Sequence, residues 1–239
     1  MALVRAAAAA AAGDARPPPP SMTRLVRAVR ALSPEERANT LTHGAGVVLS
    51  LAGVAALALQ VRAPQEPRHA LAIAVYGVCL ISLFAASTLC HLATVTTSSR
   101  VRRLTLTLDY VCIYLVIAGT YTPFLLTAVG GSRGTALLVA VWTLGVAGML
   151  WEVLGGRRSE VVACAAYLAM GWLAVLVAEP LMAALGRDGV GLLVAGGLCY
   201  SAGVVFFLLR RMPYAHAVWH LFVLAGSALH YAGVLRLSL

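Results

Sequence analysis

Two histidines, His216 and His220, stand four residues apart in the stretch HAVWH, near the start of a long apolar run. On a helix this spacing puts both rings on one face, with Cβ atoms about 5–6 Å apart, close enough to bind one metal ion. The pair alone is a weak signal, because interhelical hydrogen bonding explains it equally well and the glutamate of the zinc-protease motif is absent. Its chemistry therefore depends on what other segments bring to the same place.

Other polar residues stand near the ends of other apolar runs. Ser87 and His91 close the second run, in STLCH. Asp109 opens the third run, and Asn39 and His43 open the first. A common site needs elements that bring these ends together.

The sequence is too apolar for an ordinary soluble protein: 61% of its 239 residues are hydrophobic, 11% are charged, and the mean hydropathy is +0.87. About 20 helical residues cross a bilayer. The sequence therefore predicts an all-α, seven-transmembrane helix bundle, with spans at roughly 41–61, 69–92, 106–128, 134–154, 161–179, 189–209 and 214–236.

All eighteen basic residues are arginines, and their distribution predicts which side of the membrane each terminus faces. Thirteen lie in the N-terminal segment and in the loops on its side, and five lie on the other side. Because basic residues accumulate on the cytoplasmic side, we expect the N-terminus inside and the C-terminus outside. The net charge of +9 follows from this asymmetry and from contact with the cytoplasmic leaflet, and gives no reason to expect nucleic-acid binding.

With alternating helix directions, the polar residues of the first, second, third and seventh runs all fall at the cytoplasmic ends of their helices. An ionisable side chain inside a span costs about 2.5–3.5 kcal/mol at mid-membrane, so it normally faces the bundle interior and has a partner there. A divalent metal ion is the simplest shared partner for several neutral imidazoles and a carboxylate. We therefore expect one polar layer that contains a metal site.

The expected ligands are His91, His216 and His220, because three nitrogens and a water form the open coordination typical of catalytic zinc (Zn2+). Asp109 is then placed to hold or deprotonate the water. Ser87, one turn before His91, is placed to hydrogen-bond to the water or to a developing oxyanion.

His43 and Asn39 are expected behind the ligands, where they orient the rings or carry protons. The presence of Ser87 and of Asp109 in a span, each taken alone, also has a simpler explanation. Ser87 can bond to a carbonyl of its own helix, and Asp109 can pair with a loop arginine such as Arg103.

Two further histidines lie outside the expected layer. His69 stands at the opposite mouth of the second run, and His230 follows His220 by ten residues, about 15 Å along a helix. Neither is expected to reach the metal ion.

The N-terminal segment differs in composition from the rest. Residues 1–32 combine an alanine run, a proline run and scattered arginines, which predicts a disordered tail; a targeting peptide, or a start at Met22, are the alternatives. A seven-helix membrane domain is expected over 33–239. It opens with Ser33 as a helix N-cap, Pro34 at the first helical position and Glu36 as the acid of a capping box.

Five segments stand out in order along the chain: EERANTLTHGAG (35–46), SLFAASTLCHL (82–92), LDYVCIYLVIAGTYTPFLL (108–126), YLAMGWL (167–173) and HAVWHLFVLAGSALHYAGVL (216–235). Together they resemble the haemolysin III branch of the progestin and adipoQ receptor superfamily. The resemblance implies a seven-helix bundle with zinc near the cytoplasmic side, held by His91, His216 and His220, with Ser87 and Asp109 in supporting places. It also implies kinship with membrane hydrolases suspected of cleaving lipid amides, and with bacterial haemolysins linked to membrane-fluidity homeostasis.

We therefore expect an integral zinc protein of a bacterial plasma membrane, which is a metal-dependent hydrolase of lipid amides or a membrane-homeostasis factor. Its expected partners are membrane lipids, and the sequence does not identify a protein partner. The alternative is a non-enzymatic protein, either a pore-forming cytolysin or a membrane-state sensor with structural zinc. A water-filled pore needs polar residues through its full depth, whereas here they stop at one layer, which disfavours the pore.

Overall fold

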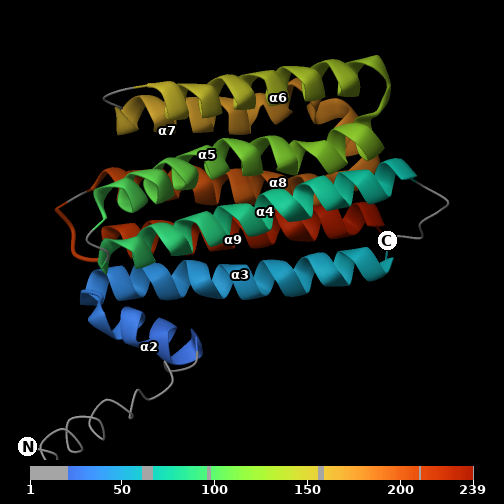
Figure 1. The fold of residues 1–239 in the computed structure, drawn as a ribbon. Coiled ribbons are helices and arrows are strands. Elements are labelled where there is room, and N and C mark those ends of the chain that lie inside the picture. Colours follow the sequence, from blue (N-terminus) through green and yellow to red (C-terminus); the bar gives the residue numbers. More distant parts are fainter. Residues whose placement is uncertain (1–20, 61–66, 96–97, 156–158, 210, 239) are drawn as a thin grey trace, which may run out of the picture. The chain divides into compact units, whose positions relative to one another are not determined.

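The computed structural model describes residues 21–60, 67–95, 98–155, 159–209 and 211–238, and all regular structure in them is helical, as predicted. Seven α-helices, α3 to α9, lie side by side and run along a common direction (Figure 1). Two short 3-10 helices, η1 and η3, and one π-helix, η2, lie between them. The elements are α3 Pro34–Gln60, α4 Pro67–Leu92, η1 Ala93–Val95, α5 Ser99–Pro123, η2 Phe124–Val129, α6 Gly131–Leu154, α7 Glu160–Gly171, η3 Trp172–Val177, α8 Ala178–Leu208 and α9 Ala215–Ser238.

The N-terminal segment forms a unit of its own, apart from Leu32–Leu239. Residues 1–20 of the expected disordered tail lie outside the described residues, whereas Ser21–Ala31 form helix α2. The alanine and proline runs end at Pro20, and the eleven residues after it contain no glycine or proline. A composition averaged over 32 residues therefore conceals a segment that can be helical.

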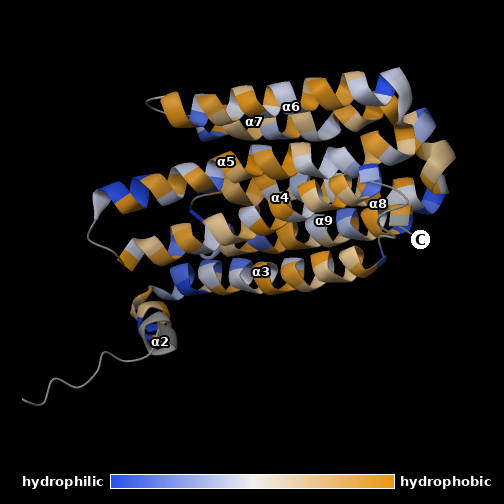
Figure 2. Ribbon diagram, turned by 45° about the vertical axis from the view of Figure 1, so that its right-hand side comes forward, coloured by the Kyte–Doolittle hydropathy of each residue, from blue (hydrophilic) through white to orange (hydrophobic). Residues whose placement is uncertain are grey.

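Six helical segments of the described chain are long and apolar enough to cross a membrane. Large apolar side chains on their outer faces are exposed, among them Val48 at 67%, Leu59 at 89% and Leu154 at 80%. Hydrophobic residues accordingly predominate along the bundle helices (Figure 2). Such a surface is unfavourable in water and suits the hydrocarbon of a bilayer. The six segments are Pro34–Gln60, Pro67–Val95, Ser99–Val129, Gly131–Leu154, Glu160–Leu208 and Ala215–Leu237.

The segment Glu160–Leu208 differs from the others because its backbone breaks inside it. It contains α7, η3 and α8 and is 49 residues long. Within α8, Gly186 has φ 67° and ψ −177°, which is not helical and divides α8 into two helical pieces. A positive φ of this kind is readily adopted by glycine, which has no Cβ.

Helix α3 is the neighbour of both helices that carry the predicted metal ligands, because it packs against α4 and against α9. The approach of α3 to α4 depends on Gly46, where an added Cβ would lie 2.4 Å from the ring of Phe84. This packing brings the first turns of α3 and α9 beside the last turns of α4.

Candidate metal centre

The cap predicted at the start of α3 is confirmed. The Ser33 hydroxyl accepts a hydrogen bond from the backbone N–H of Glu36 at 3.2 Å, and the Ser33 carbonyl accepts one from Arg37 at 2.9 Å. The cap fixes where α3 begins, and therefore which of its residues face α4 and α9.

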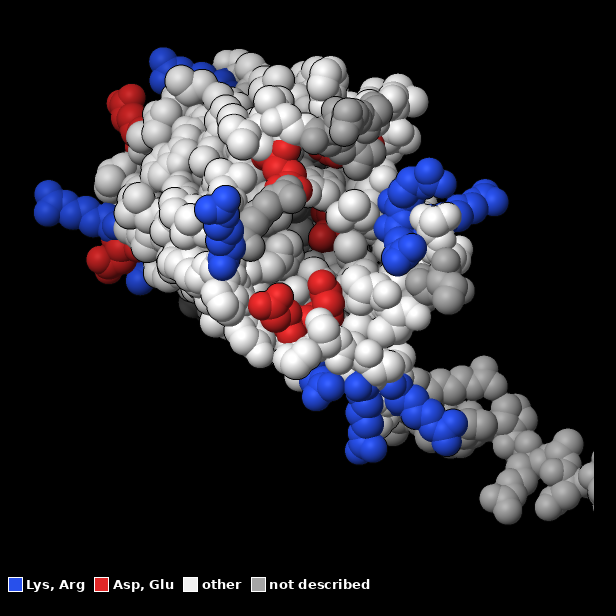
Figure 3. Space-filling model, turned by 90° about the vertical axis from the view of Figure 1, so that its left-hand side faces the viewer, with Lys and Arg blue, Asp and Glu red and all other residues white. Residues whose placement is uncertain are grey.

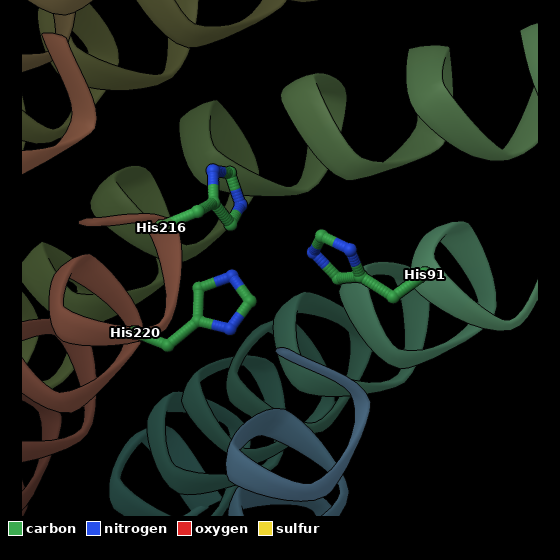
Figure 4. A group of neighbouring side chains, drawn as sticks. All are labelled: His91, His216 and His220. Atoms are coloured by element: carbon green, nitrogen blue, oxygen red, sulfur yellow. The ribbon is translucent and has the colours of Figure 1, made fainter. Parts of the chain in front are cut away.

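Three histidine rings converge at this end of the bundle. His91 comes from the last turn of α4, and His216 and His220 from the first turns of α9. One ligand nitrogen of each lies within 4.8 Å of the other two, and the rings face one another (Figure 4). The ring centroids are 4.6 Å apart for His216 and His220, and 5.0 Å apart for each of them and His91. The three can hold a metal ion.

The His91 ring is held by a carboxylate. Its Nδ1 lies 2.7 Å from Oε2 of Glu36, so the Nδ1–H donates to the acid. The other nitrogen, Nε2, is buried and has no hydrogen-bond partner in the described residues. Because the proton is on Nδ1, the lone pair is on Nε2, the nitrogen available to a metal ion.

The His220 ring is held by α3 in the same way but by neutral groups. Its Nδ1 lies 3.0 Å from Oγ1 of Thr42 and 3.2 Å from the backbone carbonyl of Asn39. The Thr42 hydroxyl already donates to the carbonyls of Ala38 and Asn39, so it accepts from the imidazole. Here too Nδ1 is the donor, and Nε2 carries the lone pair.

His43 and Asn39, expected behind the ligands, are both buried there. The His43 ring stacks on that of His220, with centroids 3.5 Å apart and planes 17° apart, and its edge meets Phe84. Both nitrogens of His43 and Oδ1 of Asn39 are buried and lack hydrogen-bond partners within the described chain. Asn39 reaches a ligand through its backbone carbonyl, and its side chain hydrogen-bonds to Glu36.

Ser87 and Asp109 lie beside the three histidines. Ser87, on α4, is buried, Asp109, on α5, is partly exposed, and their side chains form a hydrogen bond. Both line the cavity that His91, His216 and His220 also line. An acid and a hydroxyl therefore face the same space as the three rings.

This cavity has a volume of about 280 Å³ and extends from the polar layer along the bundle to His230. Its lining changes from the polar layer to mainly apolar side chains of α5, η2, α7, α8 and α9, such as Ile117, Phe124, Leu181 and Leu193. At the polar end the molecule is hollowed, and acidic side chains gather at the hollow (Figure 3). The cavity is thus a long apolar space with reactive groups at one end.

The two histidines excluded from the site do not join the group of three. His230 uses Nε2 to donate to the backbone carbonyl of Leu193 at 3.0 Å. His69 lies in the first turn of α4, at the other end of that helix from His91.

Two contacts of the centre were not predicted from the sequence. Capping was expected to account for Glu36, but only its N–H serves the cap, and its carboxylate binds His91. The i, i+3, i+7 spacing of Glu36, Asn39 and His43 puts all three on one face of α3, and this spacing is a signal that could have indicated the contact. Thr42 lies off that face, and its contact with His220 depends on how α3 and α9 pack.

Comparison with known proteins shows which family the chain belongs to. The profile of the family described as "Haemolysin-III related" matches residues 33–231. The chain belongs to this family. The matched range contains every residue of the centre described above, from Glu36 to His220.

Relatives of the family cover nearly the whole chain. The chain is 40% identical to "Hemolysin-3" of Bacillus cereus over 214 residues, which are 90% of this chain and 94% of that protein. It is 38% identical to "Hemolysin-3 homolog" of Bacillus subtilis (strain 168), over 81% of this chain and 90% of the relative. It is 32% identical to the human "Monocyte to macrophage differentiation factor", over 84% and 83% of the two chains.

The family and the apolar helices together establish where the protein resides. It is an integral bacterial membrane protein of the haemolysin III type. The resemblance stated from five sequence segments is confirmed.

Proposed function

We propose that this haemolysin III protein binds zinc and hydrolyses lipid amides within the membrane, and in this way contributes to membrane homeostasis. One observation carries the proposal. Three converging imidazoles and a Ser87–Asp109 pair lie at one end of a long apolar cavity.

The residues present fit a zinc ion. All three candidate ligands are imidazoles, which suit zinc, and they leave a coordination position for water or substrate. The ligand atoms of the group lie within 4.8 Å of one another, and Nε2 of His91 is a buried acceptor for which the described residues offer no hydrogen-bond partner. A buried polar atom without a partner is costly, and a bound cation removes that cost.

Bound zinc supplies Lewis-acid activation of a water and of a carbonyl oxygen. Asp109 accepts the proton of the attacking water at a carboxylate oxygen and returns it to the departing amide nitrogen. Ser87 holds the Asp109 carboxylate by its hydrogen bond, and so keeps it turned toward the three rings. His43 stacks on the His220 ring and the Asn39 carbonyl accepts a hydrogen bond from it, so both hold that ring in place.

The shape of the cavity supports a lipid as substrate. A molecule with one polar, hydrolysable group and a hydrocarbon chain would place the group at the histidines and the chain along the apolar lining. Burial of the chain contributes about 0.8 kcal/mol per methylene, so the apolar part provides binding energy and the polar end provides the chemistry.

We propose seven spans rather than six, with the N-terminus in the cytoplasm. As one straight helix the 49-residue segment Glu160–Leu208 would extend about 74 Å, more than twice the roughly 30 Å of a bilayer core. The break at Gly186 supports a reversal there and hence two spans. The arginine distribution then places the metal centre at the cytoplasmic end.

Reporter fusions at Leu239 test this topology. Activity of a reporter that works only outside the cytoplasm is the expected result, because an odd number of spans separates the termini. A reporter active only in the cytoplasm would contradict the seven-span arrangement and the assigned depth of the centre.

The chemistry is tested with purified, zinc-analysed protein in lipid nanodiscs and a ceramide-type amide as substrate. Asp109→Asn should lower turnover by about 10²–10⁴-fold, the usual contribution of a general base, and leave the zinc content unchanged. Asp188→Asn is the matched control, because Asp188 is exposed and near Arg236, far from the three histidines. It should retain full turnover.

The non-enzymatic alternatives make different predictions. If the zinc-loaded protein cleaves no lipid amide and Asp109→Asn affects only stability, zinc is structural and the hydrolase proposal is wrong. The name of the Bacillus cereus relative raises the second alternative, a cytolysin. Ion conductance through vesicles containing this protein would support it.

A further inference from the structure

The Glu36 carboxylate is engaged at the metal centre although its helix cap does not require it. In a capping box the acid side chain returns to the N–H of the cap residue. Here the Ser33 hydroxyl caps the N–H of Glu36, while Oε2 of Glu36 lies 2.7 Å from Nδ1 of His91 on another helix. The acid therefore joins α3 to a metal-ligand candidate on α4.

The contact determines which ring nitrogen of His91 is free. A carboxylate at Nδ1 fixes the proton there and the lone pair on Nε2, and it makes Nε2 a stronger electron donor. It also restricts rotation of the ring about its side-chain bonds. Nε2 is then a buried acceptor that has no hydrogen-bond partner among the described residues, in the group of three converging histidines.

The other anchored ligand does not have this charge. Nδ1 of His220 meets the Thr42 hydroxyl and the Asn39 carbonyl, both neutral. Among the described residues, the ring of His216 makes no hydrogen bond. Among the hydrogen-bond partners found for the three rings, Glu36 is thus the one that combines a hydrogen bond with a negative charge.

The neighbouring acid provides a natural comparison. Glu35 is adjacent in the first turn of α3, but its Oε1 accepts from the backbone N–H of Tyr214 at 3.1 Å. Both acids thus contact another segment of the chain at the same end of the bundle. Only Glu36 contacts a candidate ligand.

We propose that Glu36 is a positioning residue of the metal centre, which holds His91 with Nε2 directed at the ion and strengthens that bond through its charge. The inference rests on the proposed zinc site. Helix α3 supplies none of the three candidate ligands, but through Glu36 it controls the affinity of the site for the ion.

The test measures metal binding by the full-length protein, independently of catalysis. Zinc affinity is determined by chelator competition for the wild type, Glu36→Gln and the matched control Glu35→Gln. Glu36→Gln keeps the size of the side chain and removes the charge. It should weaken zinc binding by about 10–100-fold, the usual cost of losing the orienting partner of a metal ligand. Glu35→Gln should bind zinc within about twofold of the wild type.

A spectroscopic measurement separates positioning from general stability. With cobalt(II) in place of zinc, Glu36→Gln should shift the position or intensity of the visible bands, because the His91–metal bond changes. Glu35→Gln should give the wild-type spectrum. Should Glu36→Gln fail to fold, Glu36→Asp, which keeps the charge but is one methylene shorter, should fold and show a shifted spectrum.

The outcomes separate this inference from the proposed function. If the wild type binds zinc, and Glu36→Gln has the same zinc affinity and the same cobalt spectrum as the wild type, the role of Glu36 is overturned and the metal centre is not. Equal losses in Glu35→Gln and Glu36→Gln would also overturn it, because a general effect of acidic charge would then explain both. A wild type that binds no zinc would refute the proposed metal centre itself.

Discussion

Helix α9 carries histidines at both ends of one cavity, and the two ends differ in what surrounds the rings. At the α3 end, His220 donates from Nδ1 to α3 and meets His91 and His216 at ring distances of 5.0 and 4.6 Å. At the other end, His230 donates from Nε2 to the Leu193 carbonyl and packs against Tyr200. His220 and His230 are thus the same residue type, on the same helix, and line the same cavity.

The difference shows what turns a membrane histidine into a candidate ligand. At the near end a third helix, α3, hydrogen-bonds to Nδ1 of His91 and of His220, and both rings belong to the group of three that converges. At the far end a single ring is satisfied by a backbone carbonyl, so it joins α8 to α9. Convergence and a fixed tautomer, rather than the presence of imidazole, separate the two environments.

The largest effect expected from this comparison is on metal binding. His91→Ala and His220→Ala should each weaken zinc binding by more than the roughly 10–100-fold that loss of an orienting partner costs, because each removes a direct bond to the ion. His230→Ala, the control from the far end, should leave zinc affinity within about twofold. Chelator competition on the purified proteins measures all three.

His230→Ala should still have a cost, in stability. It removes the hydrogen bond to the Leu193 carbonyl, worth about 0.5–1.5 kcal/mol, and the ring that packs against Tyr200. A lower unfolding temperature with normal zinc content is therefore expected. Loss of zinc in His230→Ala, comparable with that in His220→Ala, would mean that the two ends are not independent.

The near end was largely predictable because spacing and depth are properties of the sequence. The i, i+4 spacing of His216 and His220 fixes a shared face, and alternating spans put His91 and Asp109 at the same depth. The contacts of α3 were not predictable in this way. Those of Thr42 and the Asn39 carbonyl with His220 depend on how two distant helices pack, and a backbone carbonyl leaves no trace in the pattern of residue types.

The fold, like the metal centre, has features that the sequence predicts and features that it does not. Hydropathy located the apolar helices, because burial in lipid requires an apolar surface along each of them. It placed a connection between runs near 180–188, but helix continues through most of that stretch, which contains the good helix formers LMAAL. The break occurs at one residue, Gly186, whose positive φ is a backbone property that composition does not reveal.

Packing at the far end provides a further test. Gly196, on α8, has no Cβ, and an added one would lie 2.3 Å from Cδ2 and 2.6 Å from Nε2 of His230, and 3.2 Å from the carbonyl oxygen of Gly226. Gly196→Ala should therefore push His230 out of place or separate α8 from α9. Overpacking of this kind costs about 1–3 kcal/mol. We expect a lower unfolding temperature in detergent, with zinc affinity unchanged.

Gly191→Ala is the matched control for Gly196→Ala, since it lies on the same helix and an added Cβ there would meet no atom within 4 Å. Alanine is a better helix former than glycine by about 0.8–1.0 kcal/mol, so Gly191→Ala should leave stability unchanged or raise it. A loss of stability in Gly196→Ala without a loss in Gly191→Ala would attribute the effect to the contact with His230. A loss of zinc affinity in Gly196→Ala would instead show that a displacement of His230 changes the position of His220 through α9. The two ends would then be coupled rather than independent.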